Sequence, residues 1–258
     1  MTKLVHGTRF SRIQFHLARA ALLVVVALAW AWLYAADQTM TAMQGQGTLA
    51  RLMAAMMSPG EGLHYLLATA LMWLVMMVAM MTPSALPMML VFRDLERGPG
   101  GEFDSLWFGA GYLLAWSGFA LLAAVLQWWL HGQGYLHGHS LATSRAAAGG
   151  ILIVAGLWQL TPLKAACLAR CRGPLSFFLS HWRGGRRGAL AMGLRHGLFC
   201  IGCCWMLMGL MFGGGAMSVV TMAALAVFIL AERVLPGGVW VSWVAGLGLL
   251  VWGGAMVL

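Results

Sequence analysis

Six or seven stretches of the chain, of which the sixth is short, are apolar over nearly the length that a helix needs to cross a lipid bilayer. A hydrocarbon core of about 30 Å requires about 20 apolar residues in helical form. Backbone inside lipid must satisfy its own hydrogen bonds, and these runs lack the period-two alternation of barrel strands. The sequence therefore predicts an all-α fold, a polytopic transmembrane bundle of six to seven helices, at 17–36, 64–82, 106–130, 146–163, 193–212, 217–231 and 239–257.

The composition agrees with a chain that has the lipid bilayer as its main partner. Hydrophobic residues make up 61% of the sequence and charged residues only 9%. We expect a single membrane domain over residues 1–258. The first apolar run follows a basic stretch, as a signal peptide would, but it is long and Ala35-Ala36-Asp37 is a poor cleavage site. We therefore predict that this run is a retained helix.

Positive charges cluster on one side of the predicted bundle. With seven helices and a cytoplasmic N-terminus, all of the 16 Lys and Arg residues except Arg51 and Arg145 lie in cytoplasmic segments. Positive residues concentrate on that side, so this orientation is predicted, with the C-terminus outside. Loop 164–195 is basic and carries no acid, as expected near anionic headgroups. The net charge of +9 thus needs no nucleic-acid partner, and no P-loop indicates a nucleotide.

Five cysteines form two tight groups, both at predicted cytoplasmic ends: Cys167 and Cys171, then Cys200, Cys203 and Cys204. Residues three and four apart share a helix face, so each group presents its thiols together. Cytoplasmic thiols stay reduced, and an odd number argues against a simple disulfide framework. Thiolates select Cu(I) and other soft ions, so the pattern favours metal binding.

The first cysteine group is predicted to lie on a short helix of its own. Thr161 followed by Pro162 is typical of a helix start, an N-cap and then proline in the first turn. Gly173 and Pro174 mark its end. A helix over 162–172 places the two thiols of this group one turn apart on the same face.

Further soft donors follow at helical spacing on two of the apolar runs. With the five cysteines, the candidate metal ligands are His196, Met72, Met76, Met80, Met208 and Met211. Methionine at such spacing is also common in packed cores, and that alternative stays open. Pro83 and Pro87 are expected to break or kink the second helix near its cytoplasmic end.

A glycine-rich outer loop holds three histidines, His131, His137 and His139. An H-x-H pattern can bind copper or zinc, whereas loop histidines are also commonly solvated. His64, at the outer end of the second run, carries the same two alternatives.

Two other functions remain open beside metal binding. A membrane thiol oxidoreductase would use Cys200 and Cys203 with a quinone, although their predicted side is reducing. A structural or assembly partner would use all the sulfur atoms for packing alone. Since no haem-attachment or hydrolase motif appears, we expect no enzymatic activity.

Three sequence blocks together resemble the bacterial predicted metal-binding integral membrane proteins, some of which are described as copper chaperones that support copper-enzyme maturation. The blocks contain Met72-Trp73, Met76-Met77, Met80-Met81 and Pro83; Gln159-Leu160-Thr161-Pro162-Leu163-Lys164, Cys167 and Cys171; and Cys200-Ile201-Gly202-Cys203-Cys204-Trp205 with Met208. Trp158 stands where that family usually has tyrosine, a mild exchange between amphipathic aromatic residues.

The resemblance implies association with copper, as Cu(I), with zinc or another soft metal not excluded. It also implies a multi-pass protein of the bacterial inner membrane and a recipient copper protein as partner. All five cysteines need not bind one ion.

Overall fold

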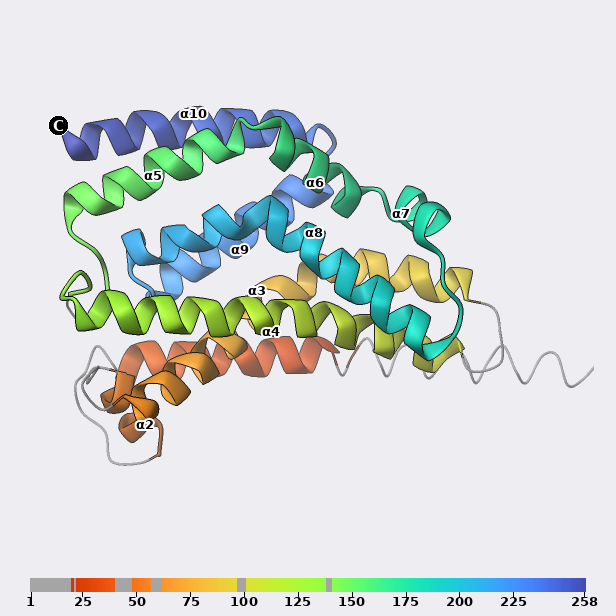
Figure 1. Ribbon diagram of the computed structural model, residues 1–258, viewed down its shortest axis with the longest axis horizontal. Helices are drawn as coiled ribbons and strands as arrows, with labels where there is room; N and C mark the ends of the chain where they lie inside the picture. The colour runs from red at the N-terminus through yellow and green to blue at the C-terminus, as the bar shows by residue number, and fades with distance from the viewer. Residues whose placement is uncertain (1–19, 21, 40–47, 57–61, 97–100, 138–140) are drawn as a thin grey trace, which may run out of the picture.

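The computed structural model describes residues 20, 22–39, 48–56, 62–96, 101–137 and 141–258 (Figure 1). Apart from a backbone bridge between His137 and Ala142, the regular structure in these residues is helical. This confirms the all-α class. The helices are Leu22–Thr39, α2 (Thr48–Met56), α3 (Leu63–Leu95), α4 (Gly101–Gly132), α5 (Arg145–Gln159), α6 (Pro162–Arg172), α7 (Pro174–His181), α8 (Gly185–Gly214), α9 (Val219–Val234) and α10 (Gly238–Val257).

Five of the described helices are long and apolar enough to cross a membrane: Leu22–Thr39, α3, Asp104–Gly132 within α4, α8 and α10. Helices α5 and α6 meet at a bend of 67°, and the pair would make a sixth span. The predicted sixth helix, expected at 217–231, is present as α9 with 16 residues. The fold is thus that of a membrane helix bundle, whereas its orientation stays a prediction.

Helix α8 lies at the centre of the arrangement (Figure 1). It packs along α4 on one side and against α5, α6 and α9 on others, while α10 packs along α5. The α5–α10 contact depends on facing glycines. A methyl group on Gly156 would lie 2.8 Å from the Gly246 carbonyl oxygen, and one on Gly246 would lie 3.0 Å from the Gly156 carbonyl oxygen. Such small residues allow membrane helices to approach closely.

Helix α3 does not end at 82 as predicted but continues through both of its prolines to Leu95. Pro83 cannot donate a hydrogen bond to the Ala79 carbonyl, one turn earlier. The indole N–H of Trp30 donates to that carbonyl oxygen instead, at 3.2 Å. Neighbouring helices commonly supply such replacement partners in membranes, which explains why α3 tolerates Pro83 in its interior.

The predicted loop 164–195 is largely helical. It contains α6, α7 and the first turns of α8, which begins at Gly185 rather than at 193. Phe177 and Phe178 of α7 are buried against Phe92 and Phe108. The early start of α8 was not predicted because its first turns are basic. Positive charge predicts that a segment lies outside lipid, but it does not exclude a helix there.

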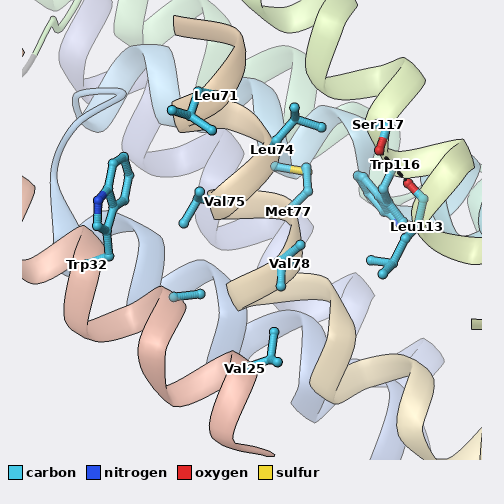
Figure 2. Close-up of a pocket in the computed structure, with 11 residues that line it drawn as sticks. Val25, Trp32, Leu71, Leu74, Val75, Met77, Val78, Leu113, Trp116 and Ser117 are labelled. Atoms are coloured by element: carbon cyan, nitrogen blue, oxygen red, sulfur yellow. Dashed lines mark hydrogen bonds between the residues drawn. The ribbon is translucent and has the colours of Figure 1, made fainter. Parts of the chain in front are cut away.

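An apolar cavity of about 480 Å³ lies between the first helix, α3 and α4 (Figure 2). Its lining includes Trp32, Val75 and Trp116. The Ser117 hydroxyl already donates to the Leu113 carbonyl oxygen at 2.8 Å. The cavity therefore offers lipid-like surroundings and no thiolate, so the metal candidates have to be sought elsewhere.

Candidate metal centre

Helix α8 presents three thiols on one buried face. Cys200, Cys203 and Cys204 are at most 2% exposed. The sulfur atoms of Cys203 and Cys204 lie 3.1 Å and 2.9 Å from the Cys200 carbonyl oxygen, as donors within the preceding turn. The three- and four-residue spacing thus gathers these thiols as the helix period requires.

Helix α6 brings a fourth thiol to this group. The Cys171 sulfur lies 4.0 Å from the Cys203 sulfur. Cys167, one turn earlier, faces the same helix, since a methyl group on Gly202 would lie 3.0 Å from its sulfur. The two cysteine groups, separate in sequence, therefore meet along the α6–α8 contact.

Local sequence explains where α6 begins. The Thr161 hydroxyl accepts a hydrogen bond from the Lys164 backbone N–H at 3.2 Å, and Pro162 occupies the first turn. This confirms the predicted N-cap and fixes the start of the helix just after the 67° bend.

A guanidinium group lies among the sulfur atoms. One terminal nitrogen of Arg233, near the end of α9, lies 2.7 Å from the Cys200 sulfur, 3.7 Å from that of Cys203 and 4.0 Å from that of Cys204. The other terminal nitrogen donates to the Ser84 hydroxyl at 2.6 Å. Arg233 is buried.

The surroundings of Arg233 favour a negative charge on a neighbouring sulfur atom, of which that of Cys200 lies nearest. No carboxylate of the described residues lies within ion-pair distance of this guanidinium. A buried charge needs a counter-charge, and the neighbouring sulfur atoms can supply it as thiolates. Cys200 is also 3.0 Å from the Tyr112 hydroxyl, which lies 3.1 Å from the Met81 carbonyl oxygen.

A buried ion pair flanks the thiols. Glu232, beside Arg233 in sequence, accepts from the Lys164 ammonium at 2.5 Å, the Gln159 amide at 3.0 Å and the Ser242 hydroxyl at 2.7 Å. Lys164 and Glu232 are almost fully buried. This network joins α5, α6, α9 and α10 at a single oxygen of Glu232, Oε1.

The methionine candidates lie in the same apolar core as the α8 cysteines. This core includes Met72, Met76, Met80, Met208 and Met211. All five are at most 2% exposed. Packing alone also produces such burial, so their role as ligands stays a prediction.

His196 lies apart from the sulfur contacts. Its ring packs against Phe108, Tyr112 and Phe177, with centroids 5.6–5.9 Å away. Within the described part of the chain, neither ring nitrogen has a hydrogen-bond partner. The structure thus places His196 in an aromatic cage and not on a sulfur atom.

The outer histidines that the structure describes have contacts of different kinds. His131 lies 3.0 Å from the Tyr65 hydroxyl, and His137 takes part in a backbone bridge. His139 lies outside the described residues, and His64 is exposed.

Across the described residues, no group of three or more His, Cys, Asp or Glu side chains is arranged to hold a metal ion. Nothing in the sequence marks Tyr112 or Ser84 as neighbours of the thiols, whereas Arg233 could have been suspected. A charged pair at the end of an apolar run was the available clue, since ionisable residues in membranes usually face a functional interior. That pair is Glu232 and Arg233.

Comparison with known proteins adds a family to this geometry. Residues 70–256, most of the chain, match the sequence model of PpoB2, described as a copper chaperone. Among curated proteins and among solved structures, no match is found. The matched region contains α4–α9, most of α3, α10 except its last residue, all five cysteines and Arg233. The chain therefore belongs to the PpoB2 copper chaperone family.

Proposed function

We propose that this membrane protein binds Cu(I) through its clustered thiols and hands the ion to a recipient copper protein. The family supports a copper-related role as a chaperone rather than as a catalyst. The observation that carries the proposal is the approach of Cys171 on α6 to Cys203 on α8, at 4.0 Å between sulfur atoms.

This separation suits two thiolates that share one ion. Metal–thiolate bonds are about 2.3 Å long for zinc, so sulfur atoms about 4 Å apart can reach a common ion of similar size. Cys200 and Cys204 lie on the same helix face and would complete the ligand set by small side-chain rotations. Cys167 would be a further ligand or a first point of capture, because it is less buried than the α8 thiols.

The methionines would serve as secondary positions. Thioether sulfur is a weaker, uncharged soft ligand, so the rows on α3 and α8 would let a soft ion move through the core rather than hold it. His196 would be a minor ligand at most, reached only if its ring left the aromatic cage. No ATP-binding motif is present in the sequence, so affinity or a concentration gradient would drive the movement.

Metal analysis of purified protein tests the proposal. We expect the wild type, loaded with Cu(I) under reducing conditions, to retain copper. The Cys200→Ser/Cys203→Ser/Cys204→Ser variant should lose it. A matched variant, Met206→Leu, changes a partly buried sulfur on the same helix that is not among the proposed ligands and should retain copper. Equal copper in the wild type and the triple variant would refute the proposal.

Transfer needs a second measurement. Copper-loaded protein is mixed with a soluble Cu(I) chelator or a copper-free recipient protein, and copper in each fraction is followed with time. Release that requires the thiols, and that stops when they are blocked with an alkylating reagent before loading, is the expected result. A disulfide that forms and breaks during this reaction would instead favour a thiol oxidoreductase.

A further inference from the structure

We propose that Arg233 makes the thiol site selective for a monovalent soft cation, such as Cu(I) or Ag(I), over a divalent one such as Zn(II). This inference rests on the proposed function, because it names the class of ion that the same site accepts. Thiolate ligands alone do not give this selectivity, since they bind zinc as well as copper.

The guanidinium is held beside the sulfur atoms, so its positive charge would act on any ion that they bind. One terminal nitrogen lies between 2.7 Å and 4.0 Å from three sulfur atoms. The other is anchored by the Ser84 hydroxyl at 2.6 Å. Because the side chain is buried and fixed at both nitrogens, its charge stays close to any ion that the sulfur atoms bind.

No acidic group of the described chain neutralises that charge. Glu232, the neighbour of Arg233 in sequence, is engaged by Lys164, Gln159 and Ser242. Among the described residues, the guanidinium makes its polar contacts with the thiols and one hydroxyl. A cation in this site therefore meets the positive charge of Arg233, which among the described residues only the thiolates can offset, in an interior that screens poorly.

The repulsion grows with the charge of the ion. At a separation of about 4 Å from the guanidinium, each added unit of charge on the ion lowers its binding affinity. The factor is about fivefold in the water-like limit and about a thousandfold at an effective dielectric constant of about 20. A divalent ion carries one unit more than Cu(I). Arg233 should thus shift the preference toward the monovalent ion by at least about fivefold.

Arg233 also stabilises the thiolates, and both ions need these. This second effect changes each absolute affinity but cancels in the ratio of the two affinities when both ions use the same sulfur atoms. The ratio therefore reports the charge of Arg233, whereas a merely structural role would lower both affinities together.

The experiment is a competition between Ag(I) and Zn(II) for the purified full-length protein in detergent, in chloride-free reducing buffer. Bound metals are counted after equilibrium with mixtures of known free concentrations. Arg233→Gln should lower the preference for Ag(I) at least about fivefold. Arg233→Lys, which keeps the charge, should retain it. Arg195→Gln removes an exposed positive charge from the cysteine helix and should leave the preference unchanged.

A second variant keeps the test decisive if Arg233→Gln does not fold. Ser84→Asp would place a carboxylate beside the guanidinium and neutralise it without removing it, so the preference for Ag(I) should fall. An unchanged ratio in the folded variants would overturn the inference. A loss of selectivity in Arg233→Lys equal to that in Arg233→Gln would overturn it too, since charge would not be the cause.

The two proposals fail in different ways. If the triple serine variant at 200, 203 and 204 holds as much Ag(I) as the wild type, the thiol site itself is refuted. If that variant loses Ag(I) while Arg233→Gln keeps the wild-type ratio, only the role of Arg233 is refuted.

Discussion

Replacing Lys164 by methionine should be one of the most destabilising single changes in the bundle. Its ammonium lies 2.5 Å from a Glu232 oxygen, and the two side chains are 1% and 2% exposed. Removing one partner of a buried ion pair leaves the other charge uncompensated, which typically costs about 3–5 kcal/mol. Lysine and methionine have similar lengths, so the substitution removes the charge with little change in packing.

The structure places the expected cost near the lower end of that range. After the change, Glu232 keeps two donors, the Gln159 amide at 3.0 Å and the Ser242 hydroxyl at 2.7 Å. These soften the loss of the ammonium, so we expect about 3 kcal/mol. The double variant Lys164→Met/Glu232→Gln buries no unpaired charge and should fall within about 1.5 kcal/mol of the wild type.

Equilibrium unfolding in mixed detergent micelles measures these differences, with helical circular dichroism as the signal. Arg170→Met is the matched control, because Arg170 is an exposed positive residue on the same helix and should change stability by about 0.5 kcal/mol or less. The single variant Glu232→Gln is measured as well. A loss of unfolding free energy in the double variant equal to the sum of the losses in Lys164→Met and Glu232→Gln would refute the reasoning, since it would show no coupling between Lys164 and Glu232.

Four further outcomes follow, three from the geometry and one from the charge pattern. Cys171→Ser should lower copper retention more than Cys167→Ser, because only the former sulfur lies within 4.0 Å of an α8 thiol; copper analysis of both variants compares them. Gly156→Leu should separate α5 from α10 and lower thermal stability in detergent, since even a methyl group would lie 2.8 Å from backbone oxygen. Trp30→Phe leaves the Ala79 carbonyl without its indole donor and should cost about 1–3 kcal/mol in the same unfolding assay. Thiol-reactive probes that cannot cross membranes should label Cys171 only from the cytoplasmic side if the charge pattern predicts the orientation correctly.

Sequence patterns were sufficient for the features that depend on one helix at a time. Apolar length predicted the bundle, and the Thr161-Pro162 pair predicted where α6 begins. They failed at the end of α3, because a proline ends a helix only when no other group satisfies the freed carbonyl. The donor in this case, Trp30, comes from a different helix and has no mark in the local sequence.

The neighbours of the thiols could not be predicted for the same reason. Cys200 and Cys203 share a helix face by spacing alone, whereas Tyr112 reaches Cys200 only through the packing of α4 on α8. His196 illustrates the converse. Its spacing from Cys200 places it among the predicted soft ligands on one face of α8, yet it packs against aromatic rings of other helices.

Arg233 joins these observations into one electrostatic argument. In a poorly screening interior, a lone guanidinium is costly to bury, and so are several thiolates held together. Each reduces the cost of the other, and the Lys164–Glu232 pair is neutral in itself, so it leaves that balance unchanged. The charge that an arriving ion meets is therefore set by how many thiols are ionised against one fixed positive charge. This makes ion charge, alongside ligand softness, a property on which the site can discriminate.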